Sequence, residues 1–321
     1  MKTIKYLALA LLPAFALTAC GKEEGIHVSM PKEVVTKYYD EDGSVEIKKD
    51  IYAYDKNGNV TFNEDFYYND EAKKFDEYQK NEYAFDKDGN EIQFLQYKYS
   101  DSSYKPSYKV LNTYQDKKVI KEETFNFDAS GNEILVSYKS DFAYDDQNRN
   151  TAFNEYSYNE ETKVFDKTKT NKFEYKGDIK EFAKLEENDL ANPTYSYTKV
   201  REFNDKGQIV SEIGATADNT YVEAELFVYN EDGNVQSNQS YFVDYETGAY
   251  HLLSVAETNY VNKHYASEQM VTYYNDDGNI KIYRECKYTY DDKMNVLSYT
   301  EKEYNPETKK MELTQETTMS Y

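Results

Sequence analysis

Tyr54-Asp55-Lys56-Asn57-Gly58-Asn59-Val60 is one copy of a short unit that recurs along the chain and predicts how the chain folds. The unit is an aromatic residue, Asp or Asn, two mostly polar residues, Gly, Asn and an apolar residue. Asn-Gly and Asp-Gly supply the positive φ angle that tight hairpin turns require. Seven copies keep the glycine, at Gly43, Gly58, Gly89, Gly131, Gly207, Gly233 and Gly278. We expect a chain reversal at each.

Other turns fall between these copies. Two copies, at 144–150 and 290–296, have lost the glycine, and a second kind of turn is typified by Tyr158-Asn159-Glu160-Glu161-Thr162-Lys163. With weaker turns included, one of them near Lys263, a reversal falls about every 15 residues from Gly43 to Thr308. Subtracting the turns leaves strands of about ten residues, which span about 33 Å.

The segments between turns alternate like strands and show no convincing helical period after Lys32. One of them, 222–228, carries apolar residues on both faces. We therefore predict an all-β chain of about twenty strands in up-and-down antiparallel order. Open twisted sheets rarely exceed about ten strands without curling, so we expect a coiled or partly single-layer sheet. Whether it is open, coiled or closed is left undecided.

Aromatic residues support this fold. The chain has 36 Tyr, and seven turns follow two aromatics placed one residue apart, as in Tyr52 and Tyr54. Residues two apart on a strand face the same way, so neighbouring strands should stack their rings into a ladder. These rings are expected to form a thin core rather than a ligand platform.

Acidic residues dominate the charge. The 60 Asp and Glu exceed the 38 Lys and Arg, and the net charge is -22. Binding to phosphates needs clustered Lys and Arg, so this balance argues against a nucleic-acid partner. Charges on both faces of the strands also argue against a sheet embedded in a membrane.

The first nineteen residues resemble a bacterial lipoprotein signal peptide. Lys2 and Lys5 precede an apolar run, and Leu17-Thr18-Ala19-Cys20 is similar to a lipobox. The resemblance implies cleavage between Ala19 and Cys20 and attachment of fatty acyl chains, such as palmitate, to Cys20, which would be the link to the membrane. We thus divide the chain into a signal peptide (1–19), an anchor and tether (20–32) and a repeat domain (33–321).

Gly21-Lys22-Glu23-Glu24 follows the predicted anchor. It looks like the export tags of some surface lipoproteins of Gram-negative bacteria, and it fits a solvated tether equally well. We expect a lipid-anchored protein of the cell envelope, at the outer membrane. It would be on the cell surface if Gly21-Lys22-Glu23-Glu24 acts as an export tag.

The repeated unit, from Tyr39 to about Val296, resembles the YD repeat of Rhs-type proteins. Known YD repeats build a long antiparallel sheet that coils into a hollow shell around a toxin. This chain is far shorter than such shells and no toxin-like segment follows the repeats, so only the strand-and-turn geometry is carried over.

Residues suited to chemistry are sparse. The acidic turn at Asp86 lacks the spacing of a calcium loop. His27, His251 and His264 show no metal-binding or catalytic spacing, and Cys286 is expected to be a buried structural thiol. We predict no catalytic residues, no metal site and no cofactor.

The sequence therefore favours a non-catalytic envelope lipoprotein whose Tyr-rich sheet serves as a binding or structural module. A strand edge or a Tyr-rich face would meet a protein or glycan. The alternatives are a surface glycan-binding protein and an immunity or toxin-linked YD-repeat protein. An enzyme would be favoured by a pocket holding two carboxyl groups with a strongly raised pKa.

Overall fold

The computed structural model describes residues 30–40, 42–244, 247–261, 265–275 and 278–321, which form twenty antiparallel strands and one short 3₁₀ turn. This confirms the predicted all-β, up-and-down order. The elements are β1 (Glu33–Tyr39), β2 (Val45–Tyr54), β3 (Val60–Asn69), β4 (Lys74–Phe85), β5 (Glu91–Ser100), β6 (Ser103–Gln115), β7 (Lys118–Phe127), β8 (Glu133–Tyr144), β9 (Asn150–Asn159), β10 (Val164–Tyr175), β11 (Phe182–Asp189), η1 (Pro193–Tyr195), β12 (Tyr197–Phe203), β13 (Ile209–Thr216), β14 (Val222–Tyr229), β15 (Val235–Val243), β16 (Tyr250–Tyr260), β17 (Ala266–Tyr274), β18 (Ile280–Tyr290), β19 (Val296–Asn305) and β20 (Lys310–Ser320).

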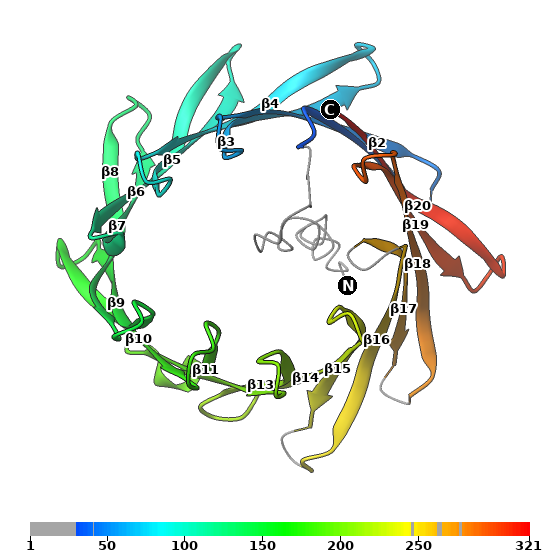
Figure 1. The fold of residues 1–321 in the computed structure, drawn as a ribbon. Helices are drawn as coiled ribbons and strands as arrows, with labels where there is room; N and C mark the ends of the chain where they lie inside the picture. Colours follow the sequence, from blue (N-terminus) through cyan, green and yellow to red (C-terminus); the bar gives the residue numbers. More distant parts are fainter. Residues whose placement is uncertain (1–29, 41, 245–246, 262–264, 276–277) are drawn as a thin grey trace.

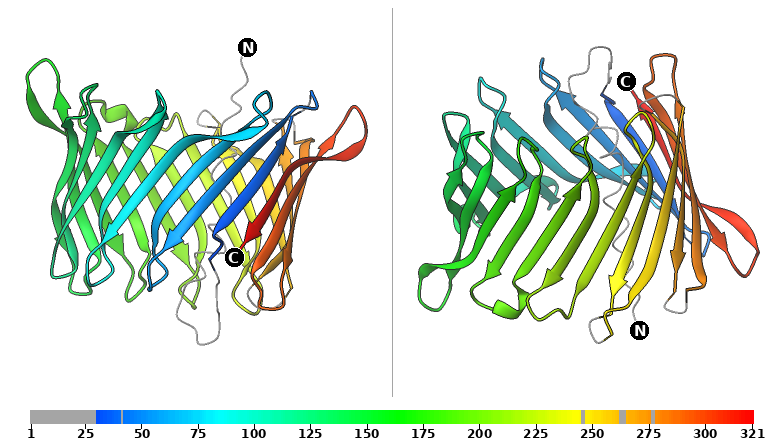
Figure 2. Two further views of the ribbon diagram at one scale, coloured as in Figure 1. Left: turned by 90° about the horizontal axis from the view of Figure 1, so that it is seen from above. Right: turned by 60° about the horizontal axis from the view of Figure 1, so that its bottom comes forward.

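The sheet closes on itself. Each strand pairs with the next along the chain, and β1 pairs with both β2 and β20, with Thr36 opposite Thr317. Figure 1 shows the resulting ring, and Figure 2 shows the strands tilted across its wall, as closure of a twisted sheet requires. Because β1 and β20 pair, the expectation that a free strand edge meets a partner is wrong.

The hairpins form two rims. The connections β2–β3, β4–β5 and so on lie at one end, where β1 begins and β20 ends, and we call this end the entry rim. The connections β1–β2, β3–β4 and so on lie at the opposite rim. Four of the seven turn glycines, including Gly58 and Gly233, lie at the entry rim.

The turn units satisfy their own polar groups. Asp86 Oδ1 accepts hydrogen bonds from the N–H groups of Asp88 (2.8 Å) and Asn90 (2.9 Å), and the Asn90 amide donates to Oδ2 at 2.8 Å. The side-chain bond from Asn90, followed by the backbone N–H groups, holds the pKa of Asp86 below its usual range. Each of the seven predicted glycines has φ between 76° and 88°. Asn148 and Met294 take positive φ where the glycine is missing.

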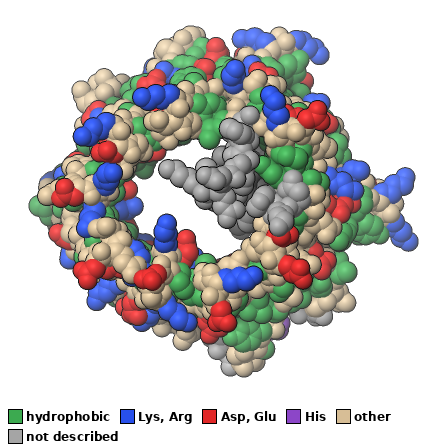
Figure 3. Space-filling model, in the orientation of Figure 1, with side chains coloured by type: hydrophobic (Ala, Val, Ile, Leu, Met, Phe, Trp, Pro, Cys, Tyr) green, Lys and Arg blue, Asp and Glu red, His purple; other side chains and the backbone are tan. Residues whose placement is uncertain are grey.

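The two faces of the wall differ in burial. Most of the buried side chains belong to one alternating set, which includes Thr36, Asp50, Asn171 and Cys286. This is the inner face, because side chains converge on the inside of a curved sheet. The same set includes Tyr54, whose hydroxyl donates to the Pro31 carbonyl, and Figure 1 shows the described chain starting inside the ring. Figure 3 shows that the cylinder is hollow.

Candidate functional site on the inner wall

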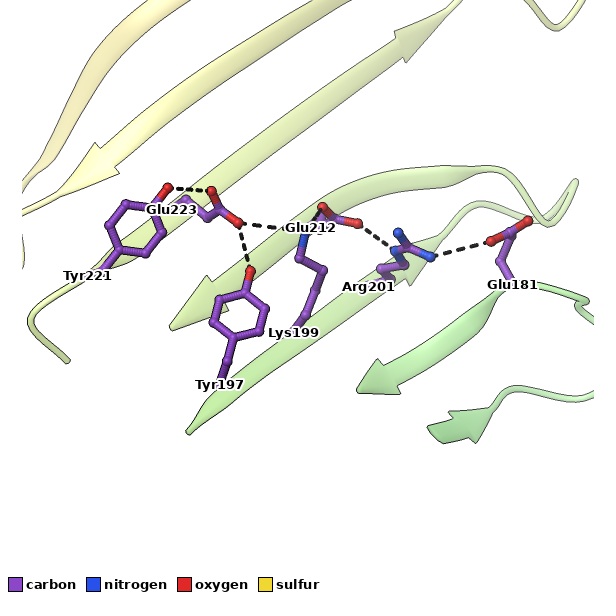
Figure 4. Close-up of polar contacts among 7 residues, drawn as sticks. All are labelled: Glu181, Tyr197, Lys199, Arg201, Glu212, Tyr221 and Glu223. Carbon is purple, nitrogen blue, oxygen red and sulfur yellow. Dashed lines mark hydrogen bonds and ion pairs between the residues drawn. The ribbon is translucent and has the colours of Figure 1, made fainter. Parts of the chain in front are cut away.

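A network of charged side chains crosses β12 and β13 on the inner face (Figure 4). Arg201 lies opposite Glu212 in register, and its Nε contacts Glu212 Oε2 at 2.5 Å. Lys199 Nζ contacts Glu212 Oε1 at 2.6 Å. Both carboxylate oxygens of Glu212 are therefore held by cations, as a half-buried charge requires. Arg201 also lies over the ring of Phe182, which joins the network to neighbouring aromatic rings.

Two phenols extend the network to β14. Glu223 accepts hydrogen bonds from the hydroxyls of Tyr197 at 2.6 Å and Tyr221 at 2.7 Å. Burial favours the neutral acid, but these two bonds and the nearby Lys199 keep the pKa of Glu223 below its usual range. Burial raises the pKa of Tyr197, and the bond to Glu223 adds to the rise, so the phenol stays a donor. The arrangement positions hydroxyl groups and carboxylates on a wall that faces the lumen.

A second inner-face cluster pairs two carboxyl groups. Asp50 of β2 lies directly opposite Asp65 of β3, and Lys48 Nζ lies 2.8 Å from Asp50 Oδ1 and 3.7 Å from Asp65 Oδ2. Burial, reinforced by the charge of Asp65, raises the pKa of Asp50 to about 6 against the opposing effect of Lys48. Asp50 and Asp65 are only 7% and 8% exposed. They are thus shielded from a substrate, and the pair fits a structural role better than a catalytic one.

Cys286 lies in a third inner-face cluster. Its Sγ is 3.3 Å from the hydroxyl of Tyr299, which donates to Glu301 at 2.7 Å. The thiol is free and buried, which confirms the prediction of a buried structural cysteine. Burial raises the pKa of Cys286 to about 11, so the thiol stays protonated and is a poor nucleophile.

Near the entry rim, tyrosines tie most of the hairpins to the hairpin before them. In eight cases the hydroxyl of the last Tyr of an even-numbered strand, or of Tyr321 just after β20, donates to a backbone carbonyl at or just before the start of the preceding strand, at 2.5 to 3.1 Å. We call each such contact a tyrosine clasp. The pairs are Tyr54 to Pro31, Tyr114 to Glu91, Tyr144 to Val119, Tyr175 to Asn150, Tyr229 to Ile209, Tyr260 to Val235, Tyr290 to Ala266 and Tyr321 to Val296.

The clasps were not predicted from the sequence, although a signal for them is present there. The clasping tyrosines recur about every 30 residues, twice the spacing of the turns, as Tyr229, Tyr260, Tyr290 and Tyr321 show. The expected ring ladder is found beside them, for example where Phe153 stacks on Phe142 at 5.3 Å between ring centroids.

Other predicted residues are placed apart from these clusters or lie outside the described residues. Ala19 and Cys20 lie outside, as do His27, Lys263 and His264. His251 lies on β16. In the described part of the chain, no group of three or more His, Cys, Asp or Glu side chains is placed to hold a metal ion. The described residues also include no helix long and apolar enough to cross a membrane.

Comparisons with known proteins give weak likenesses. The sequence matches no family model and no curated protein. Among solved structures, a porin-like protein from Bacteroides uniformis is 10% identical over 91% of this chain and 98% of its own, with a TM-score of 0.37. A porin-like protein from Bacteroides vulgatus has the same identity and coverage and a TM-score of 0.33. A DUF3836 family protein from Bacteroides vulgatus is 20% identical over 27% of this chain and 90% of its own, with a TM-score of 0.23.

Proposed function

We propose that the chain is a non-catalytic lipoprotein of the cell envelope whose closed sheet stands in water and serves as a binding or structural module. The observation that carries this proposal is the charge on both faces of the wall. The outer face holds ion pairs such as Lys80–Glu82 (3.0 Å) and Lys121–Glu123 (2.7 Å), and the inner face holds Lys199–Glu212. Such pairs are costly in lipid and ordinary in water.

The inner wall is the proposed binding face. It combines aromatic rings with hydroxyl groups and carboxylates, as around Glu223, and so suits a protein or glycan partner. A lipid anchor on Cys20 would hold the module at the outer membrane of a Gram-negative bacterium, exposed on the surface if residues 21–24 are an export tag. The strand-and-turn unit is proposed to be a degenerate YD repeat.

Lipidation of Cys20 and digestion of intact cells test this proposal. Labelled palmitate should enter the wild-type chain and the Cys286→Ser control but not Cys20→Ser. Protease added to intact cells should cleave the surface-exposed protein while a periplasmic marker survives. Wild-type protein without label would refute the anchor, and full protection from protease would refute surface exposure.

Binding through the inner wall needs its own test. Glu223→Gln keeps the shape of the side chain and removes its charge, whereas the control Glu82→Gln makes the same change on the outer face. If the wall binds a partner, a glycan array or a cross-linked pull-down should lose signal with the first variant and keep it with the second. Equal binding by both variants would place the partner elsewhere.

A further inference from the structure

The outer face of β12–β15 carries an exposed apolar patch. Val200, Ile213, Ala224 and Tyr241 form one register row across the four strands, and Leu226 and Val228 continue the patch along β14. We call these six residues the outer apolar patch. Four of its side chains are large and open to solvent, with Val200 45%, Ile213 42%, Leu226 42% and Val228 52% exposed.

The patch is unlike the rest of the outer wall. The described outward-facing residues of β13, β14 and β15 include no charged side chain. Elsewhere the outer face bears ion pairs, for example Lys184–Glu186 at 2.5 Å on the neighbouring β11 and Lys287–Glu285 at 2.9 Å on β18. In Figure 3 hydrophobic side chains gather along the outside of the lower wall, where β14–β16 lie in Figure 1. Contiguous exposed apolar surface of this kind marks an interaction site.

We propose that a second copy of this chain covers the outer apolar patch, in a side-by-side dimer with two-fold symmetry. A two-fold contact places the same surface on both partners, so it must be free of like charges that would face each other. With a net charge of -22, most of the wall would repel a second copy, and β13–β15 are where outward charges are missing.

The charges around the patch disfavour a membrane as its occupant. Surfaces that lie in a lipid interface surround their apolar side chains with Lys and Arg. Here Glu202 on β12 and Glu257 on β16 flank the patch. Lys184 on β11, opposite Val200, is already paired with Glu186 at 2.5 Å. An apolar sheet face whose central strands carry no outward charge suits another such face, packed sheet on sheet.

The arrangement also fits a lipid anchor, and this step rests on the proposed function. β13–β15 lie across the ring from β1, the first described strand (Figure 1). A two-fold axis parallel to the cylinder axis keeps both entry rims on the same side, so both anchors can enter one membrane. Confinement to that membrane raises the effective concentration of each copy.

Sedimentation velocity on the full chain in detergent micelles tests the dimer. The wild-type chain should form a dimer whose dissociation constant rises about 10- to 100-fold in Leu226→Glu, because the contact would bury an unpaired carboxylate. Leu226 is exposed in the single copy, so the variant should fold, and circular dichroism checks this. The matched control Thr113→Glu adds the same charge to the outer face of β6 and should leave the dimer unchanged.

Cross-linking in cells gives a second readout. Ile213→Cys, near the centre of the patch, should give a disulfide-linked dimer, and Thr113→Cys should not.

A wild-type chain that stays monomeric at every concentration, or a dimer that survives both Leu226→Glu and Ile213→Glu, would overturn the proposal. Patch-dependent binding of a monomer to phosphatidylethanolamine vesicles would overturn it in favour of a lipid surface. Micelle experiments do not depend on lipidation in the cell, so their failure is separate from failure of the proposed anchor.

Discussion

At the residue scale, Gly214 shows how one missing side chain shapes the inner wall. A Cβ at this position would collide with the hydroxyl end of Tyr197, whose ring lies across the glycine to reach Glu223. Gly214→Ala should displace the phenol, break its bond to Glu223 and destabilise the fold by about 1–3 kcal/mol in urea unfolding. In a Tyr197→Ala background the same change should cost much less, since the collision is gone. Equal costs in both backgrounds would contradict this account.

Asp50 gives a residue-scale prediction about pH. Its folded-state pKa of about 6 lies above the ordinary 3.8, so the folded chain binds the proton more tightly than the unfolded chain. Protonation of Asp50 therefore adds on the order of 1–3 kcal/mol to the free energy of unfolding. This contribution is complete below about pH 4 and is lost as pH rises through 6. Carboxyl groups with lowered pKa, such as Asp86, act at lower pH and with the opposite sign.

The measurement is the free energy of unfolding between pH 5 and 7.5. Asp50→Asn mimics the protonated acid, so its stability should fall less with rising pH than that of the wild type, and it should be the more stable of the two at pH 7.5. Asp88→Asn, in an exposed turn, is the control and should follow the wild-type curve. The prediction fails if the free energy of unfolding of the wild type rises through this window and Asp50→Asn follows the same curve. That result would show that Asp50 is ionised throughout.

At the scale of the element, the hairpin is held by a clasp as well as by its turn. In Tyr144→Phe the ring stays and the hydrogen bond to the Val119 carbonyl (2.7 Å) is lost. We expect a loss of about 0.5–1.5 kcal/mol and faster amide exchange in β7 and β8. Tyr250, which is 60% exposed, supplies the control: Tyr250→Phe should change neither. Phe85 and Phe203 occupy two of the clasp positions naturally, so the fold tolerates the change, and loss of the whole sheet would argue against this local role.

The elements were predictable because their causes are local. A glycine such as Gly58 with its preceding Asp55 fixes a turn within five residues, and alternation fixes which residues share a face. The clasps were missed because a phenol and its acceptor carbonyl lie about 25 residues apart and the acceptor can be any residue. The cluster at Asp50 and Asp65 was missed for a related reason, since only the cross-strand register places them opposite each other. Among sixty acidic residues, nothing in the sequence distinguishes this pair from others.

At the scale of the whole molecule, closure joins the two ends of the described chain. It depends on twist and register summed over twenty strands, so no single segment of sequence encodes it. At the seam the hydroxyls of Thr36 and Thr317 lie 3.1 Å apart and are almost fully buried. On the outer face Lys37 and Glu316 pair at 3.3 Å. The seam is thus held by the same kinds of side-chain contact as the other strand pairs.

A disulfide across the seam tests closure directly. Thr36→Cys with Thr317→Cys places two thiols on facing positions 281 residues apart in the chain, so their disulfide restricts the unfolded state strongly. The chain-entropy argument gives up to about 5 kcal/mol for so long a loop, less any strain in the folded state. Under oxidising conditions the double variant should unfold at a higher urea concentration than either single variant, and a reductant should abolish the gain. Cys286 should not interfere, because its thiol is buried and protonated. Failure of the two cysteines to join in the folded protein would mean that the sheet is open in solution, and the inner wall would then lose its enclosed lumen.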